Sequence, residues 1–388
     1  MIIGLLGFEF ESSNKGCEAL SYAVMPILNS ITEDLQIVVF NIHDSLGKIP
    51  DKFPNIKFKN VKIKIKSKNF WKEFKILLNE CNIILDITHG DSFSDIYGKK
   101  WLIQTNLLKS FVLLNNKPLV LMPQTYGPFN NCFFKQWSKI IINKAYKVYS
   151  RDKKSTHYIT DELKCKNITP FTTYDLAFSL PYDNLYNKKN KIKIGINISG
   201  LLWNYKKMKN NNISLNVDYI KYHELLIEWL IRNDKYEIYL VPHVLCTERE
   251  GEDYYDNDCK VLKEIQNKYK KCIYRDNFET VIDVKSYISS LDILIASRMH
   301  ASIGAFSSGV CSIPFAYSRK FAGVYDDLNY KYLIDGQSLS TEEAFDITIG
   351  YINKFEEIRK YSNKCMEDIR YNSLHYIKDF KTVLEDFK

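Results

Sequence analysis

The sequence predicts an α/β protein with two Rossmann-like lobes, each built on a parallel sheet, and a C-terminal helical segment. Three observations predict this fold. The 388 residues exceed what one ordinary core accommodates, and short apolar runs alternate with longer amphipathic stretches in both halves. A polar break without periodicity then separates the halves at 181–190. We therefore expect domains at 1–180 and 192–340, a linker at 181–191 and bracing helices at 341–388.

Strands are expected where short apolar runs are bounded by turn residues. In the first half these runs are Ile2–Leu6, Ile37–Ile42, Val61–Ile65, Ile83–Ile87, Leu119–Met122 and Lys147–Ser150. In the second half they are Ile192–Ile198, Glu237–Val241, Cys272–Tyr274, Ile293–Ala296 and Ile313–Ala316. The S-x-x-E spacing of Ser340 and Glu343 is that of a capping box, which predicts a helix start.

The most basic stretch of the chain, Lys57–Lys68, alternates lysine with valine and isoleucine. This period of two indicates a half-buried strand with a solvated edge. Attraction to an anionic membrane leaflet is the alternative use of these lysines.

Composition favours a soluble protein with two packed cores, because 45% of the residues are hydrophobic and 26% are charged. No apolar run approaches the roughly 18 residues that a membrane-spanning helix needs. We therefore expect a cytoplasmic protein, with the inner face of the membrane as the alternative location. A net charge of +8 is modest for this length and does not indicate nucleic-acid binding. The nine cysteines lack a repeated CxxC spacing, so we expect reduced thiols and no metal site.

Candidate binding residues are polar side chains directly after predicted strands, since ligands of open parallel sheets bind beyond the carboxyl ends of the strands. After the first strand come Asn14, Gly16 and Glu18, where a helix is expected to begin. The glycine permits close approach of the backbone to a ligand, and the free N–H groups of a helix start attract an anion. A tight turn without a ligand is the alternative.

Three more candidate segments follow strands of the first half. His89 and Asp91 lie in a polar loop around a glycine, which indicates either a substrate-facing loop or ordinary turn chemistry. Gln124 follows a buried strand and offers a neutral hydrogen-bonding group. Arg151 would present a planar fork of donors to a carboxylate or phosphate. The alternative is that Asp152 caps a helix and Arg151 forms a structural ion pair.

The strongest candidate comprises Ile293–Ser302, Gly309 and Ile313–Lys320. Arg298 and His300 lie two residues apart on a strand-to-helix turn, so both can point into one site. Histidine suits proton transfer near neutral pH, and Lys320 would neutralise a second anionic oxygen. A structural role for His300 is the alternative. Three smaller candidates are Asp175, His243 and Tyr317.

Taken together, several segments resemble the polysaccharide pyruvyl transferase family in order and spacing, over roughly Met1 to Asp335. They are Asn14–Ala19, Met122–Gln124, Gly127–Phe129, Ser150–Ser155, Tyr174–Phe178 with Leu180–Pro181, Ser297–His300, Gly309 and Tyr317–Lys320. The series R-x-H, G and Y-x-x-K is the most specific part. The chain departs from the family at Thr88–Ser92, which replaces a glycine-rich stretch, and at Cys17 and Cys311, where an acidic residue and proline are common.

The resemblance implies a fold similar to GT-B glycosyltransferases, phosphoenolpyruvate as donor, and a sugar of a surface or capsular polysaccharide precursor as acceptor, free or lipid-linked. The product would be a pyruvate ketal on two sugar hydroxyls, formed without a cofactor. On this pattern Arg151, Arg298 and Lys320 resemble the clamp for the donor's phosphate and carboxylate, and His300 the acid/base.

Two other functions fit the same residues. A GT-B glycosyltransferase would bind a nucleotide sugar with the same basic pair, and a non-catalytic subunit of a polysaccharide assembly complex would need none of the chemistry. Donor choice separates the first from a pyruvyl transferase. Peripheral membrane contact and a homo-oligomer are both compatible with the sequence.

Overall fold

The computed structural model describes residues 1–388 except 97, 189, 209–212 and 246–254, and leaves out the side chains of residues 319, 320 and 322. The chain divides into two compact units, which are described one at a time. The first unit comprises Met1–Ser12, Leu20–Leu176 and Ile369–Lys388, and the second comprises Ser13–Ala19 and Ala177–Asp368. The short segment Ser13–Ala19 thus belongs with residues far along the sequence.

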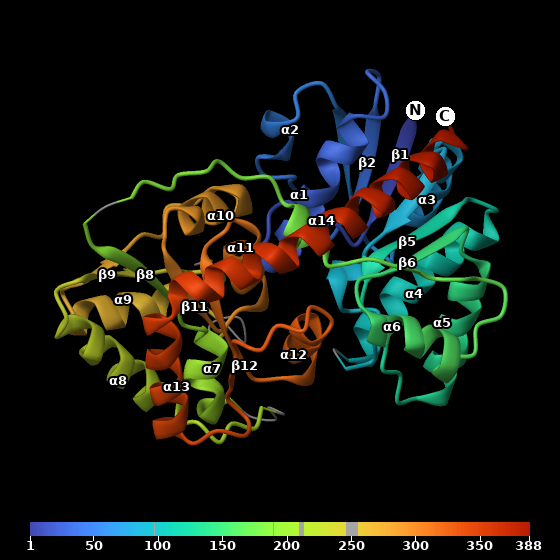
Figure 1. The fold of residues 1–388 in the computed structure, drawn as a ribbon. Helices are drawn as coiled ribbons and strands as arrows, with labels where there is room; N and C mark the ends of the chain where they lie inside the picture. Colours follow the sequence, from blue (N-terminus) through green and yellow to red (C-terminus); the bar gives the residue numbers. More distant parts are fainter. Residues whose placement is uncertain (97, 189, 209–212, 246–254) are drawn as a thin grey trace. The chain divides into compact units, whose positions relative to one another are not determined.

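The first unit contains a seven-stranded sheet in the order β3-β2-β1-β4-β5-β6-β7, with every neighbouring pair parallel (Figure 1). Its strands are β1 (Ile2–Leu6), β2 (Gln36–Asn41), β3 (Lys57–Lys62), β4 (Ile83–Asp86), β5 (Leu119–Gln124), β6 (Lys147–Ser150) and β7 (Phe171–Thr172). Its helices are α1 (Lys15–Asn29), α2 (Ile49–Lys52), α3 (Lys68–Glu80), α4 (Lys99–Leu114), α5 (Cys132–Lys144) and α6 (Lys153–His157). The first turn of α1 lies in the segment assigned to the second unit.

Helices α3, α4 and α5 cover the sheet of the first unit and contribute to one apolar core. Ser67 caps α3 by accepting from the N–H of Phe70, and Asn131 caps α5 in the same way. The side chains of Phe74 and Leu78 in α3 and of Val112 in α4 are fully buried in this core. Helix burial against the strands therefore fixes the loops at the strand ends.

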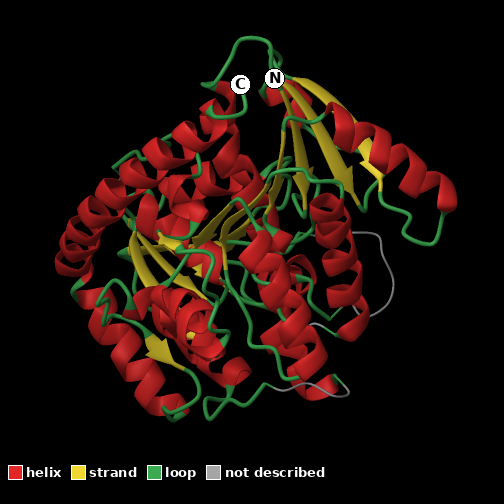
Figure 2. Ribbon diagram, turned by 90° about the vertical axis from the view of Figure 1, so that its right-hand side faces the viewer, coloured by secondary structure: helices red, strands yellow, loops and turns green. Residues whose placement is uncertain are grey.

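The second unit contains a six-stranded parallel sheet in the order β10-β9-β8-β11-β12-β13. Its strands are β8 (Ile192–Asn197), β9 (Tyr236–Leu240), β10 (Cys272–Tyr274), β11 (Ile293–Ala296), β12 (Cys311–Ala316) and β13 (Ile334–Asp335). Its helices are α7 (Gly200–Asn204), α8 (Tyr219–Ile231), α9 (Asp258–Lys268), α10 (Val281–Ser289), α11 (Met299–Ser307), α12 (Arg319–Asp326) and α13 (Thr341–Asn353), followed by α14 (Phe355–Glu385). Helices flank the strands throughout (Figure 2).

The predicted fold class is confirmed: the chain forms two parallel sheets with helices and ends in a helical segment. The capping box at Ser340 and Glu343 is present at the start of α13. The strand expected at Val61–Ile65 is wrong in its bounds, because β3 is Lys57–Lys62. Ile63 and Ile65 follow that strand and pack against the core instead. The short strands β7 and β13 were not predicted.

Membrane-spanning helices and cysteines were also considered in the sequence. No helix among the described residues is long and apolar enough to cross a membrane. Cys81 and Cys311 are buried thiols outside any disulfide. Helix α14 contributes its first part to the second unit and Ile369–Lys388 to the first.

Candidate functional site

Both sheets reverse their strand order beside their first strand, between β1 and β4 in the first unit and between β8 and β11 in the second. Such switch points leave a crevice at the carboxyl ends of the strands, where ligands of open α/β sheets bind. The predicted site residues divide between the units. The second unit holds Asn14, Gly16, Glu18, His243, Arg298, His300, Tyr317 and Lys320, and the first holds His89, Asp91, Gln124, Arg151 and Asp175.

At the switch point of the second unit, Arg298 anchors three loops through a buried carboxylate. Its Nε and Nη2 donate to Oδ1 of Asp258 at 3.2 and 2.6 Å, and Nη2 also donates to Oδ1 of Asp256 at 2.6 Å. Asp258 accepts in addition from the N–H groups of Gly200 and His243. The guanidinium therefore ties the loops after β8, β9 and β11 together. The donor clamp expected of Arg298 stays a prediction.

The backbone of Arg298 is held by the end of the neighbouring strand. Its N–H donates to Oδ1 of Asn197 at 2.9 Å, and the amide of Asn197 donates to the carbonyl of Val241. The hydroxyl of Tyr219 donates to Ser297 at 2.6 Å. These buried bonds fix the turn that starts α11, on which His300 is the second residue.

The segment Ser13–Ala19 is pinned to the loop that follows β9. The N–H of Lys15 donates to the carbonyl of His243 at 3.0 Å, and the N–H of Leu245 donates to the carbonyl of Ser13 at 2.8 Å. The side chain of Asn14 accepts from the N–H of Gly16 at 3.0 Å, which satisfies a free donor at the start of α1. Asn14 thus has a capping role whether or not it also contacts a ligand.

Gly16 is needed for the close approach of α1 to His300. A Cβ atom at position 16 would lie 2.3 Å from Nδ1 of His300, a distance that real Cβ atoms do not tolerate. The structure therefore brings Gly16 and His300 together. The sequence segments Asn14–Ala19 and Ser297–His300 alone did not indicate this contact. The starts of helices α1 and α11 both lie at this histidine.

His243 is buried beside the same group of cations. Burial, and then the charges of His300, Arg298 and Lys15, lower the pKa of His243 well below its ordinary value of 6.5. The imidazole is neutral at pH 7. The two permanent cations beside it are themselves paired, Lys15 with Glu18 and Arg298 with Asp256 and Asp258.

Glu18 and Lys285 are buried titratable groups behind this site. Burial raises the pKa of Glu18 to about 7, although its ion pair with Lys15 acts in the opposite direction. Burial lowers the pKa of Lys285 to about 7, and its ammonium donates to the carbonyl of Leu180 at 2.8 Å. A cavity of about 230 Å³ lies between Lys285, His243 and His300.

The remaining candidates of the second unit follow β12. The ring of Tyr317 packs edge-on against Phe321, with 6.0 Å between centroids. Lys320 lies in the first turn of α12, and its side chain falls outside the described part of the chain. Its predicted role in the clamp stays a prediction.

In the first unit, Arg151 and Asp175 form a buried ion pair. Nη1 of Arg151 donates to Oδ2 of Asp175 at 2.9 Å, and both side chains are at most 2% exposed. Asp152 caps α6 by accepting from the N–H of Ser155. Both parts of the structural alternative for this segment are therefore present, and the clamp role of Arg151 stays a prediction.

Gln124 lies in the interior rather than on an open surface. Its amide donates to the carbonyl of Asp86 at 3.1 Å. Asp86 in turn accepts from the buried ammonium of Lys109 at 3.3 Å and from the hydroxyl of Thr88 at 2.6 Å. Burial lowers the pKa of Lys109, although Asp86 acts in the opposite direction. This network supports the end of β4 from behind.

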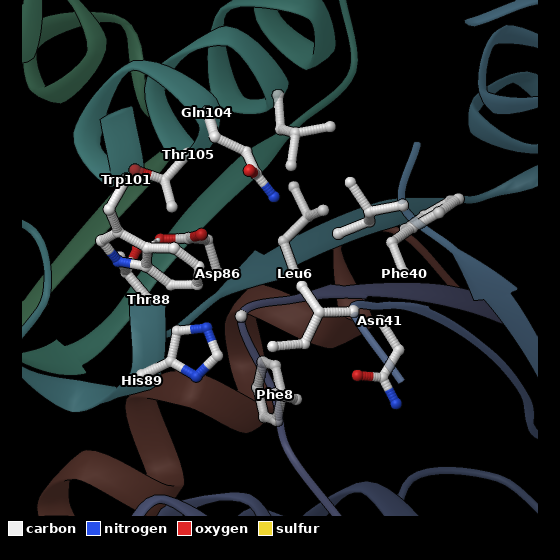
Figure 3. Close-up of a pocket in the computed structure, with 14 residues that line it drawn as sticks. Leu6, Phe8, Phe40, Asn41, Asp86, Thr88, His89, Trp101, Gln104 and Thr105 are labelled. Carbon is white, nitrogen blue, oxygen red and sulfur yellow. Dashed lines mark hydrogen bonds between the residues drawn. The ribbon is translucent and has the colours of Figure 1, made fainter. Parts of the chain in front are cut away.

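A pocket of about 400 Å³ opens in front of that network, at the carboxyl ends of β1, β2 and β4. Figure 3 shows Trp101 and Gln104 of α4 on one side, with His89 and Phe8 opposite. The pocket mixes apolar walls with amide, hydroxyl and imidazole groups. Such a lining suits a ligand with both apolar faces and hydroxyl groups.

His89 is held in this pocket by Glu9 and by strained backbone. Its Nδ1 lies 3.0 Å from Oε1 of Glu9, and its ring lies 4.9 Å from that of Trp101. Although burial acts in the opposite direction, the hydrogen bond and charge of His89 lower the pKa of Glu9 to about 2. Thr88 and His89 have φ values of 41° and 53°, in the left-handed region that β-branched residues rarely adopt. Such strain clusters at functional sites.

Gly7 makes the strained turn fit, because a Cβ atom there would lie 2.6 Å from the backbone nitrogen of Thr88. Asp91 ends the turn, and its Oδ1 lies 3.4 Å from the hydroxyl of Ser92, which donates to it. Asp91 does not line the described pocket, whereas His89 does.

Several residues of these sites were not singled out from the sequence. They are Glu9, Trp101, Lys109, Asn197, Asp256 and Asp258. A lysine at a buried position of the apolar helix α4 was a visible signal for Lys109. The carboxylate partners of Arg298 had no such signal, because their pairing depends on the fold.

The fold defines the class of protein. Anabaena HepE, solved with UDP and glucose, has a TM-score of 0.59 at 10% identity, with 100% of both chains covered. S. aureus MnaA, solved with UDP, has a TM-score of 0.58 at 12% identity, covering 93% of this chain and 90% of that one. The trehalose-6-phosphate synthase OtsA has a TM-score of 0.62 at 9% identity, with 100% and 98% covered. Identities this low show the fold alone, which is of the GT-B type.

The family is shown by the sequence. Residues 14–319 match the family model of polysaccharide pyruvyl transferases, and the chain belongs to this family. The resemblance stated above is thereby confirmed, and the family is one of transferases that act on polysaccharide. No curated protein matches the chain.

Proposed function

We propose that this protein transfers a pyruvyl group from phosphoenolpyruvate to a sugar of a surface or capsular polysaccharide precursor and forms a pyruvate ketal. The observation that carries the proposal is the group of imidazoles and helix starts at the switch point of the second unit. There His300, the neutral His243 and two helix starts surround the end of the strand that carries Arg298. Family membership supports the same reaction.

The donor belongs to the second unit in this proposal. Phosphoenolpyruvate carries a phosphate and a carboxylate, and helix starts and cationic side chains favour both. His300 contacts the donor, whereas Arg298 also positions the loops that carry His243. Lys320 and Arg151 are assigned to the clamp by the family resemblance. The proposal needs no cofactor.

The reaction balances with these groups. His300 donates a proton to the methylene carbon of phosphoenolpyruvate, which leaves a cationic centre at the adjacent carbon. A sugar hydroxyl attacks that carbon and gives up its proton to a base. The bond from carbon to the phosphate oxygen then breaks, and phosphate leaves with the electron pair. A second hydroxyl attacks the same carbon, loses its proton and closes the ketal.

The acceptor belongs to the pocket of the first unit in this proposal. Trp101 and Phe8 offer apolar surface to a sugar ring, while Gln104 offers hydrogen bonds to its hydroxyls. The carboxylate of Glu9 fixes the orientation of the His89 ring. A free or lipid-linked saccharide satisfies the same contacts.

The test is product formation with purified protein. Phosphoenolpyruvate and a saccharide acceptor should together yield phosphate, and mass spectrometry should find the ketal on the saccharide. His300→Asn should abolish both signals, whereas the matched control His375→Asn in α14 should retain them, because His375 contacts Tyr371 and not the site. Transfer from a nucleotide sugar in place of ketal formation would overturn the proposal. Retention of the full rate in His300→Asn would support a non-catalytic role for this histidine.

A further inference from the structure

Helices α4 and α5 carry a continuous apolar stripe on their outer sides. In α4 the exposed residues Ile103, Leu107 and Leu114 recur at helical spacing, and in α5 Phe133 and Ile140 do the same. Leu114 is 77% exposed and Phe133 is 66% exposed. These are large apolar side chains in well-formed helices rather than in loops.

The two stripes form one surface, because the helices pack side by side (Figure 1). The indole N–H of Trp137 in α5 donates to the hydroxyl of Ser110 in α4 at 2.8 Å. The ring of Trp137 lies 5.7 Å from that of Phe133. We call the surface formed by these two helices the α4–α5 face.

The charge on the α4–α5 face has a single sign. Neither Lys99–Leu114 nor Cys132–Lys144 contains an aspartate or glutamate. The exposed lysines Lys99, Lys100 and Lys144 lie at the ends of the two helices. The carboxylate of Asp95 lies just before α5, where it accepts from the N–H groups of Asn130 and Asn131. Exposed aromatic and aliphatic side chains on helices whose own charged residues are all lysines suit the interface of an anionic bilayer.

The basic edge strand that the sequence singled out is a weaker candidate. Lys57 is paired with Asp34 at 3.0 Å and Lys62 with Asp44 at 2.6 Å. Strand β3 also exposes no large apolar side chain. Its lysines are therefore partly neutralised, and it lacks the apolar surface that would enter a membrane.

We propose that the α4–α5 face docks the protein on an anionic lipid bilayer, with Phe133, Ile140 and Leu114 entering the headgroup region. Two copies of the face would place only positive charges opposite one another, which disfavours self-association through it. An anionic bilayer satisfies both the apolar area and the charge. Docking of this kind would bring a lipid-linked acceptor within reach, but the proposal does not depend on the reaction.

The test is co-sedimentation of the full chain with vesicles. Phosphatidylcholine vesicles that contain phosphatidylglycerol should bind the protein, and vesicles of phosphatidylcholine alone should bind it far less. Phe133→Ser with Ile140→Ser should weaken binding by about tenfold or more. Lys99→Glu with Lys100→Glu should weaken it by about tenfold, and more salt should have the same effect on wild type. Acidic residues favour a helix start, so the second variant should fold.

The matched controls lie on other surfaces. Leu374→Ser removes an apolar side chain of α14 that is also 66% exposed, and Lys270→Glu reverses an exposed charge of the second unit. Both should bind vesicles like wild type. Equal binding to both kinds of vesicle, or equal losses in the controls, would overturn the proposal. Sedimentation velocity gives a further check. If wild type is a dimer and Phe133→Ser is a monomer, the face binds a second copy of the chain, and the proposal is overturned. Donor binding by the same variants shows that the enzyme is intact.

Discussion

The two units share one strand order around the switch point, but their switch points have different chemistry. Each has a buried cation paired with an aspartate, Lys109 with Asp86 in the first unit and Arg298 with Asp258 in the second. In the first unit the histidine in front of this pair faces a carboxylate. In the second unit two histidines lie among cations. Under the proposed function, the first of these switch points binds the hydroxyl-bearing acceptor and the second binds the anionic donor.

The largest expected effect concerns the buried pairs that both units contain. Arg298→Ala and Arg151→Ala should each lower the free energy of unfolding by about 3–5 kcal/mol, because each removes the cation that is paired with a buried aspartate. Urea denaturation measures this difference. The matched control is Arg232→Ala, whose side chain is 79% exposed and which should leave stability unchanged. Losses near zero in the first two variants would show that the pairs do not anchor their units.

A second effect is the pH dependence of stability that the Glu9–His89 pair of the first unit should cause. The folded pKa of Glu9 is lowered to about 2 from an ordinary 4.5, so its stabilising contribution is present above pH 4.5 and is lost as pH falls toward 2. Wild type should exceed Glu9→Gln in stability by on the order of 3 kcal/mol at pH 6, and this margin should shrink on acidification. Denaturation series at several pH values measure it. A margin that is constant with pH would contradict the pairing with His89.

A third effect tests the close packing at the anion site. Gly16→Ala should lower turnover by about 10- to 100-fold, because the added Cβ displaces His300 from its position. The matched control is Gly304→Ala in α11, where the nearest atom to an added Cβ is 3.6 Å away. This variant should keep its rate and gain helix stability. Equal rates in the two variants would argue that the position of His300 does not matter.

The smallest effect concerns the pocket of the first unit. The indole N–H of Trp101 is buried and has no hydrogen-bond partner among the described residues. Trp101→Phe should therefore leave the stability of the protein unchanged. Its affinity for the acceptor should fall by about fivefold, because the variant lacks the hydrogen bond from the indole N–H to the acceptor. The KM for the saccharide measures this change, and the KM for phosphoenolpyruvate should stay constant. A change in the donor KM instead would place the donor, and not the acceptor, at this pocket.

Local patterns were sufficient to predict much of the fold. The apolar runs at Ile2–Leu6 and Ile293–Ala296 are strands as expected, because burial on both faces requires continuous apolar sequence. At Val61–Ile65 the alternation of lysine with isoleucine was misleading, since the strand pairs earlier and the isoleucines pack beyond its end. The two-residue strands β7 and β13 are too short to leave a pattern.

The positions of the candidate residues after strands were predictable, but the partners that the fold gives them were not, and their roles stay predictions. Polar residues after strands identified His89, Arg298 and His300, because the carboxyl ends of parallel strands share one edge. The pairing of Arg298 with Asp258 and the approach of Gly16 to His300 join segments far apart in the sequence. Only the strand order brings these segments together, so no local pattern could predict them.

The most direct test of the central claim, a phosphoenolpyruvate site at the switch point of the second unit, is isothermal titration of the wild-type protein. Phosphoenolpyruvate should bind with a stoichiometry of one, and Gly16→Ala and His243→Asn should weaken that binding, whereas Trp101→Phe should not. UDP should give no comparable heat. Heat from UDP alone, or phosphoenolpyruvate binding that changes only in Trp101→Phe, would contradict the account.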